Sequence, residues 1–240
     1  MHRVLTRKLR EHSKLVDEDI ERITKLSYVV RQYEANDDLI RQGDRPKNAV
    51  LVLSGMVGRY HLLGSGRRQY LSFHMIGDMP DAQGLFLDQM DHAVCALGRA
   101  IVALVPHADI VEAFKVRPQL GFAVWRETLI DAAIFREAIT NNSARGVRAR
   151  MAHLFCELFY RARASRVADH DQLALPLTLV QLGEALAMAI ATVNRTLLQL
   201  RTTGSVDFRD GTLTIKNWDK LAKLGEFDPG YLHVKKVPTL

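Results

Sequence analysis

The pattern of apolar and polar residues between Leu177 and Ile215 predicts two short helices followed by a hairpin. Thr178, with Gln181 three residues later, forms a capping-box pattern that starts a helix. Two apolar stripes then recur at helical spacing on either side of a break near Met188 and Ala189: Leu179, Leu182 and Leu186, then Val193, Leu197 and Leu200.

The hairpin is predicted from two turn signals after the second helix. Gly204 suits a left-handed cap, and Asp210-Gly211 between two alternating runs is typical of a tight turn. Two helices, a short turn and a hairpin make up a winged helix-turn-helix, in which the N-terminal residues of the second helix meet DNA base edges. A helical hairpin packed inside another fold is the alternative.

This interpretation predicts a small set of DNA-binding residues. Arg195 is suited to a bidentate bond with guanine, whereas Ile190 and Ala191 offer only apolar contact. Thr192 is expected near the DNA backbone. The full predicted set is Thr178, Ile190, Ala191, Thr192, Asn194 and Arg195.

Upstream, the pattern changes from helical to strand-like. A short helix is predicted from Asp17 to about Leu26, because acidic residues favour the start of a helix. From Val29 to Pro106, runs of β-type residues alternate with Gly and Asp turns, which predicts an antiparallel barrel or jelly roll. The clearest runs are Val50 to Leu53, Val57 to Leu63 and Gln69 to Met75.

Residues 118–142 form a predicted helix with two apolar sides. A helix of this kind has two surfaces to bury, so we expect it to pair with a second copy of the chain, although packing within one subunit alone is the alternative. The predicted dimer interface is Phe122, Trp125, Leu129, Ile130 and Ile134. Asn141-Asn142-Ser143 predicts a helix break and hinge.

After the predicted hinge, a helix is expected from about Gly146 to Arg163, and Arg145, Arg148 and Arg150 lie at its start. These arginines either approach DNA or form a solvated charged face. Ala168 to Leu175 is interpreted as a polar linker, and Trp218 to His233 as a short helix before the tail.

Charge and composition agree with a nucleic-acid partner. From Arg145 onward, 14 Lys and Arg stand against nine Asp and Glu, so this part carries +5 of the net charge of +6, as phosphate binding requires. Only two cysteines occur, and no metal-type pair exists. The charged N-terminus lacks a signal core, and no run of about 18 apolar residues occurs, so a cytoplasmic protein without a membrane span is expected.

The C-terminal motif resembles the Crp/Fnr family of bacterial transcription regulators. The family's recognition helix typically starts Ser/Thr-Arg-Glu-Thr-Val-Ser/Gly-Arg, and this chain has Ala189-Ile190-Ala191-Thr192-Val193-Asn194-Arg195. Thr192, Val193 and Arg195 match, whereas the usual Arg and Glu base readers are missing. The landmarks Leu39–Asp44, Val52–Gly55 and Ile76–Asp78 are similar to the β-roll of cyclic-nucleotide-binding-like domains.

The resemblance implies an α+β protein with an N-terminal antiparallel, jelly-roll-like β-roll, a long dimerisation helix and a C-terminal winged helix-turn-helix. The implied domains are a sensor β-roll at residues 1–117, the dimerisation helix and hinge at 118–143, and the DNA-binding domain at 144–240. The implied partners are palindromic double-stranded DNA and a second copy of the chain, and RNA polymerase is left open as a further partner.

The segment that binds the nucleotide in this family departs from its pattern. Asp81-Ala82 fall where Gly-Glu is expected, and His92-Ala93 where Arg-Ser holds the phosphate. Neutral His92 does not replace the bidentate charge of arginine, which argues against cyclic AMP and cyclic GMP as effectors. These four residues define the candidate effector pocket.

The sequence also bears on iron–sulfur, haem and metal cofactors. The iron–sulfur members carry an N-terminal Cys cluster, and this chain has no Cys before Cys95, so that mechanism is excluded. His92 is suited to ligating haem or another metal, because neutral imidazole is a common ligand, or else it is a hydrogen-bonded loop histidine. No cofactor is predicted.

The preferred interpretation is an effector-controlled regulator that is not an enzyme, and there are two alternatives to it. A cupin-type metalloenzyme would need a close His pair followed by Glu, but His61 and His74 stand alone and no Glu occurs between Glu34 and Glu112. The other rival is a regulator without effector, controlled by its abundance or by a partner protein.

Overall fold

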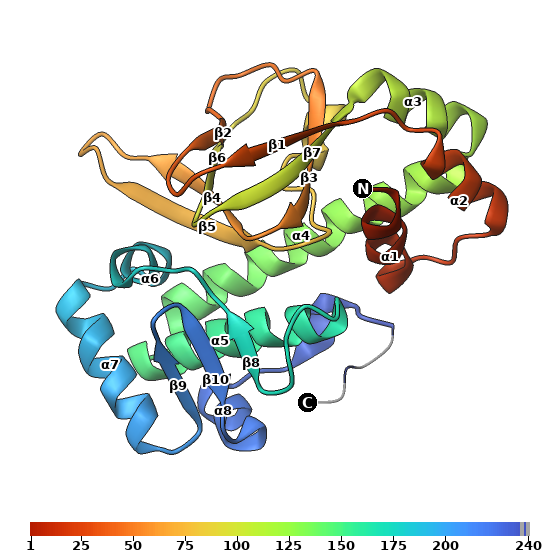
Figure 1. Cartoon of the computed structure of the whole chain (residues 1–240). Coiled ribbons are helices and arrows are strands. Elements are labelled where there is room, and N and C mark those ends of the chain that lie inside the picture. Colours follow the sequence, from red (N-terminus) through yellow and green to blue (C-terminus); the bar gives the residue numbers. More distant parts are fainter. Residues whose placement is uncertain (236–237, 239–240) are drawn as a thin grey trace. The chain divides into compact units, whose positions relative to one another are not determined.

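The structure is a computed structural model that describes residues 1–235 and residue 238 (Figure 1). Its internal contacts divide the chain into two compact units, Met1–Asp131 and Ala132–Leu240. The dividing point lies inside one long helix, within the segment 118–143 that the sequence set apart.

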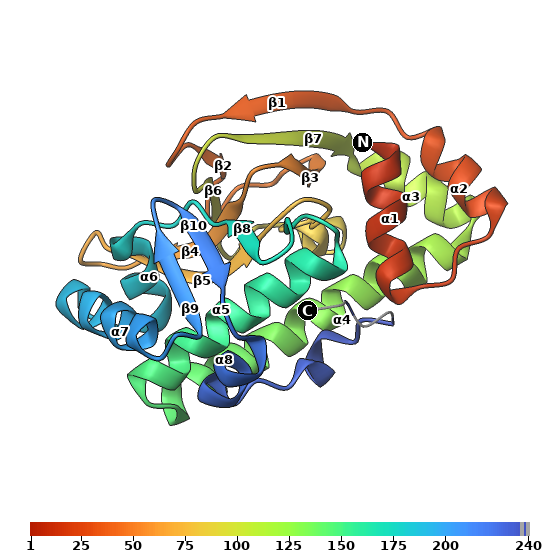
Figure 2. The same ribbon diagram turned by 60° about the horizontal axis from the view of Figure 1, so that its bottom comes forward.

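The first unit is a β-roll with helices at one end (Figures 1 and 2). β1, β7 and β3 form one antiparallel sheet, and β2, β6, β4 and β5 form the other, each in that order. The elements are α1 (His2–His12), α2 (Asp17–Thr24), β1 (Val29–Tyr33), β2 (Asp38–Ile40), β3 (Asn48–Ser54), β4 (Val57–Leu62), β5 (Arg68–His74), the 3-10 turn η1 (Ala82–Leu85), β6 (Ala93–Ala96), β7 (Ala100–Pro106), α3 (His107–Val116) and the start of α4 (Pro118–Ala144).

The strand β3 contributes to two hydrophobic cores, one on each of its faces. Its central residues are buried on both faces, because successive strand side chains point to opposite sides. Ala49 and Leu51 belong to the core that includes apolar residues of α1, α3 and α4, whereas Val50 and Val52 join the core that includes residues of the second sheet. The predicted antiparallel roll is thus confirmed, and α1 is an element that the sequence did not predict.

The second unit contains the predicted helix-turn-helix and hairpin. Figure 1 shows α6 and α7 next to each other, with β9 beside α7. Its elements after α4 are α5 (Val147–Ala164), β8 (Gln172–Ala174), α6 (Leu179–Leu186), α7 (Ile190–Thr202), β9 (Val206–Arg209), β10 (Thr212–Ile215), α8 (Trp218–Gly225) and the 3-10 turn η2 (Pro229–Leu232).

Two expectations in this unit need correction. The break expected at Asn141-Asn142-Ser143 lies slightly later, at Arg145-Gly146, since α4 continues to Ala144 and α5 begins at Val147. The supposed polar linker between Ala168 and Leu175 contains β8, which pairs with β10 and makes the wing a three-stranded sheet. Among the residues that the structure describes, none of the helices is long and apolar enough to cross a membrane.

Candidate DNA-binding surface and sensor site

The start of α6 is fixed by its capping box. Thr178 accepts a hydrogen bond from the backbone N–H of Gln181 at 3.2 Å, and the Gln181 side chain accepts the Thr178 N–H at 2.9 Å. The helix ends in a left-handed Ala187 (φ 52°), and a Cβ on Gly183 would come within 2.6 Å of the Met188 carbonyl oxygen. The turn between the two helices is therefore tight, as the sequence predicted.

The wing that follows α7 also forms as predicted. Gly204 has φ +71° just after the end of α7, and Asp210 and Gly211 have φ of 50° and 70° in the two-residue turn. Consecutive positive values are the signature of the turn type that suits the twist of a hairpin. β9 and β10 pair in register from Thr212 with Arg209 to Ile215 with Val206.

α7 separates a buried face from an exposed face. Val193 and Leu200 are fully buried, whereas Ile190, Ala191, Asn194 and Arg195 are exposed. Thr192 is half-buried on the first turn, and Thr178 stands apart at the start of α6. The structure thus gathers five of the six predicted DNA-binding residues on the first turns of one helix.

The sequence missed an exposed apolar residue of this helix. Leu198 is 57% exposed and lies three residues beyond Arg195, on the same side of α7. Val193, Leu197 and Leu200 form the apolar stripe that predicts the buried face of α7, and Leu198 lies one position outside that stripe. An apolar residue outside the stripe of an otherwise amphipathic helix was the available signal.

Side chains from α4 and α5 hold the turn of the helix-turn-helix. Asn142 donates to the Ala185 carbonyl at 3.1 Å, and Arg150 donates to the Leu186 carbonyl at 2.8 Å. These are carbonyls of the last turn of α6, which have no partner inside their own helix. The end of α4 is therefore bonded to the DNA-binding module, where the sequence predicted a hinge.

The three arginines at the start of α5 have different roles. Arg145 pairs with Glu137 at 2.7 Å and with Glu226 at 3.6 Å, and Arg150 caps α6. Arg148 is exposed in a groove that Lys220 and Lys223 also line. Arg148 is therefore the arginine of this group that is best placed for a phosphate.

The predicted effector residues are buried in the roll. Asp81 has no exposed surface and accepts the Val50 N–H with both oxygens, at 2.9 and 3.1 Å. Burial raises the pKa of Asp81 to about 7, although the Val50 bond and the positive charge of Arg59 oppose this shift. Ala82 at the start of η1 and Ala93 at the start of β6 are each 5% exposed.

His92 is hydrogen-bonded at both ring nitrogens. Its Nδ1 donates to Asp91 Oδ1 at 2.7 Å, and its Nε2 accepts from the Gln83 amide at 3.3 Å. Burial, together with the nearby charge of Arg59, lowers the pKa of this imidazole. This geometry is the hydrogen-bonded loop histidine of the alternative interpretation. Within the described part of the chain, no cluster of three or more His, Cys, Asp or Glu could hold a metal ion.

Arg59 is the residue of this region that the sequence analysis missed. It lies on β4, where the pairing with β5 shifts register between Arg59 and Tyr60, and it is only 2% exposed. Its Nε donates to the Pro80 carbonyl at 2.5 Å, and its guanidinium pairs with Asp131 on α4. A strand position between Gly58 and Tyr60 gave no indication of a buried charge.

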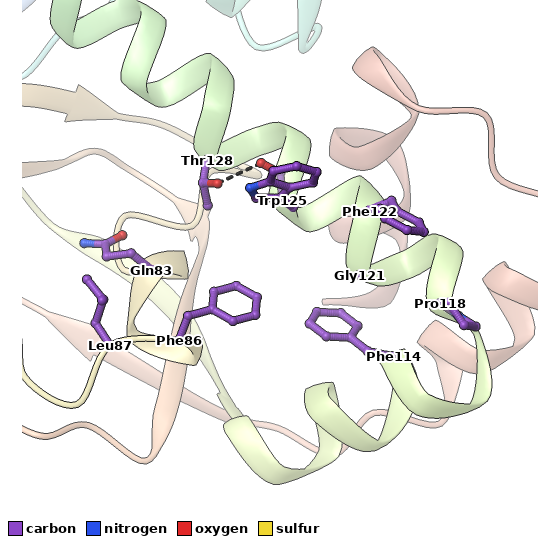
Figure 3. Close-up of a pocket in the computed structure, with 9 residues that line it drawn as sticks. All are labelled: Gln83, Phe86, Leu87, Phe114, Pro118, Gly121, Phe122, Trp125 and Thr128. Atoms are coloured by element: carbon purple, nitrogen blue, oxygen red, sulfur yellow. Dashed lines mark hydrogen bonds between the residues drawn. The ribbon is translucent and has the colours of Figure 1, made fainter.

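A largely apolar pocket of about 650 Å³ opens on the first unit (Figure 3). Phe122 and Trp125 of α4 line it and are each 53% exposed, and Leu129, one turn further on, is 50% exposed. Ile130 and Ile134 are 7% and 8% exposed within the single chain, so the exposed part of the predicted dimer face is narrower than expected. The pocket is lined by Gln83, Phe86, Leu87, Phe114, Pro118, Gly121, Phe122, Trp125 and Thr128.

Two family comparisons match this arrangement. Residues 30–116 match the cyclic nucleotide-binding domain, and residues 149–224 match the Crp-like helix-turn-helix domain. Together the two matches cover well over half of the chain. The chain belongs to the Crp/Fnr family. It is a Crp/Fnr-type transcription regulator with a DNA-binding helix-turn-helix and a cyclic-nucleotide-binding-like domain.

Individual Crp/Fnr proteins extend the comparison. The fumarate and nitrate reduction regulatory protein of Escherichia coli (strain K12) is 23% identical over 186 residues, which are 78% of this chain and 74% of that protein. Among solved structures, FixK2 from Bradyrhizobium japonicum shares 24% identity with a TM-score of 0.73, over 83% of this chain and 98% of that chain. A transcriptional regulator of the CRP family from Thermus thermophilus, TTHB099, shares 17% identity with a TM-score of 0.63, over 82% and 97%. The two structures establish the shared fold.

Proposed function

We propose that this regulator acts as a homodimer, reads a palindromic DNA site with the exposed face of α7, and does not respond to cyclic AMP or cyclic GMP. The observation that carries the proposal is the capped helix-turn-helix, which places Asn194 and Arg195 on an exposed helix start. We further propose that it acts in the cytoplasm, where its DNA target lies, and that it has no enzymatic activity. RNA polymerase remains a proposed partner.

Base reading should depend mainly on Arg195. Arg195 is the only long cationic side chain between Leu179 and Leu200, and Asn194 beside it is suited to adenine. Ile190 and Leu198, both about half exposed, offer apolar contact to thymine methyl groups. Arg195→Ala should therefore weaken binding to the cognate site by about 1–3 kcal/mol and relax the preference at one guanine per half-site.

The test is a binding-site selection with wild type, Arg195→Ala and Arg148→Ala side by side. Arg148 is the matched control, because it is an exposed arginine of the same unit whose loss should lower affinity evenly across sequences. Half-site centres should lie about 34 Å apart, one turn of the duplex. If wild type and Arg195→Ala select the same site with the same affinity, α7 does not read bases through this residue.

Dimerisation is supported by the apolar face of α4 and by the pocket beside it. Trp125 is about half exposed as a residue, which corresponds to roughly 100 Å² of largely apolar surface. At about 25 cal/mol per Å², its burial in an interface contributes roughly 2.5 kcal/mol from each protomer. Because a symmetric dimer uses this surface twice, Trp125→Glu should raise the dimer dissociation constant at least about 1,000-fold.

Sedimentation equilibrium measures this effect directly. Val29→Glu is the matched control, because Val29 is 60% exposed and lies on β1 rather than on α4. The control should remain dimeric at micromolar concentration, and Trp125→Glu should be monomeric. A monomeric wild type, or a Trp125→Glu variant that remains as dimeric as wild type, would rule out this face as the interface.

A further inference from the structure

The sensor roll contains a buried positive charge. The Arg59 side chain is 2% exposed, bonds to the Pro80 carbonyl, and lies close enough to both Asp81 and His92 to affect their titration. A guanidinium stays charged in proteins, so its removal from water is costly unless an anion accompanies it. The question is which group in the roll supplies that negative charge.

Asp131 supplies the negative charge that accompanies the buried guanidinium of Arg59. Its carboxylate pairs directly with the Arg59 guanidinium, from a position fourteen residues into α4. Asp81 is less suited, because both of its oxygens accept the Val50 N–H and because complete burial raises its pKa. His92 cannot supply the negative charge either, because an imidazole is neutral or cationic, and burial together with the nearby charge of Arg59 lowers its pKa.

The Arg59–Asp131 ion pair lies near the residues that were predicted to form the effector pocket. Asp81 and His92 occupy positions at which the sequence placed the effector pocket. Arg59 bonds to the carbonyl of Pro80, which precedes Asp81, and pairs across the sheet with Val94, two residues after His92. The four candidate residues are at most 5% exposed. A side chain of the roll and a side chain of α4 therefore already make the contact between cation and anion that a small anionic molecule would make.

We propose that Asp131 is a built-in ligand of the sensor roll, whose carboxylate ties α4 to Arg59 in place of the anionic group of an effector. The regulatory part of this inference rests on the proposed DNA-binding function. α4 continues from Asp131 into the second unit, where Asn142 bonds to the end of α6. The Arg59–Asp131 ion pair thus acts on α4, the helix that is hydrogen-bonded to the DNA-binding module.

The proposal predicts chemical rescue of a variant that lacks the carboxylate. Asp131→Ala removes a group the size of formate, and the Asp131 side chain is 23% exposed, so a small anion has a route to Arg59. Sodium formate should raise the thermal midpoint of Asp131→Ala more than sodium chloride of equal ionic strength, because a ligand that binds only the folded state stabilises it. Wild type should show no such difference.

DNA binding supplies the second readout. Asp131→Ala should bind the selected site about 5–150-fold more weakly than wild type, the usual range of coupling between two sites, and formate should recover part of the loss relative to chloride. Glu127→Ala is the matched control. Glu127 lies one turn earlier on α4 and pairs with Lys8 and His12 of α1, so this variant loses an ion pair of α4 without touching Arg59.

Formate-specific rescue in Asp131→Ala, and its absence in Glu127→Ala, supports the built-in ligand. If Asp131→Ala does not fold, Asp131→Asn keeps the side-chain shape and takes over the DNA measurement, where weaker binding than wild type is expected. Equal effects of formate and chloride on the thermal midpoint of Asp131→Ala would overturn the proposal. Wild-type DNA affinity in Asp131→Ala or Asp131→Asn would also overturn it. A wild type that selects no DNA refutes the proposed function instead, and the thermal rescue still tests the ion pair.

Discussion

The bond between Arg150 and the end of α6 offers a sharp test of how α5 holds the DNA-binding module. Arg150→Met keeps most of the apolar stem and removes the guanidinium. The variant loses the bond to the Leu186 carbonyl at 2.8 Å and the bond to the Arg145 carbonyl at 3.2 Å. The backbone carbonyl of Arg150, which accepts from Asn141, is retained.

The size of the effect follows from these two bonds. A hydrogen bond with a charged partner contributes about 1.5–3 kcal/mol, and a cation near a helix C-terminus adds about 0.3–1 kcal/mol. Arg150 is half-buried, so water compensates part of the loss. We therefore expect the free energy of unfolding of the second unit to fall by about 2–4 kcal/mol.

Urea unfolding measures this difference, and Arg148→Met is the matched control. Arg148 is an exposed arginine two residues earlier on α5, and its replacement should change stability by less than about 0.5 kcal/mol. DNA affinity should fall with Arg150→Met, because the turn before α7 loses a support. Unfolding midpoints that coincide for the two variants would show that the Arg150 bonds do not hold α6.

Two further predictions concern the sensor roll. Because burial raises the folded-state pKa of Asp81 to about 7, the folded chain holds a proton there that the unfolded chain releases, so the stability contribution of Asp81 is complete at low pH and is lost as pH rises towards 7. Urea unfolding at several pH values should show wild type losing up to about 1.4 kcal/mol per pH unit relative to Asp81→Asn between pH 5 and 7, and parallel curves would contradict this. Isothermal calorimetry with cyclic AMP and cyclic GMP should detect no binding, and micromolar affinity for either would refute the argument from the altered cassette.

The parts of the fold that the sequence predicted are those encoded by neighbouring residues. The Thr178–Gln181 capping box and the Asp210-Gly211 turn each act within a few residues, and both form as expected. Three strands of the roll, β3, β4 and β5, were also predicted, because β-type runs between Gly and Asp turns are local patterns. The exposed start of α7 followed from the same kind of evidence.

The errors occurred where distant partners decide the structure. Asn141 and Asn142 disfavour a helix interior when considered alone, but their amides donate to Arg150 and Ala185, so tertiary acceptors offset the local preference. β8 is only three residues long, and its partner β10 lies about forty residues downstream. Neither contact has a local signal.

Arg59 also alters the electrostatics of the predicted effector pocket. Two carboxylates near this site, Asp81 and Asp91, would be expected to repel a phosphate, but Asp81 is buried beside Arg59 and Asp91 is bonded to His92 at the surface. Repulsion from these two carboxylates is therefore weaker than their charges suggest. The case against a cyclic nucleotide rests more firmly on the ion pair: a phosphate approaching Arg59 would have to displace Asp131, whose carboxylate is already attached to the chain and loses little entropy on pairing.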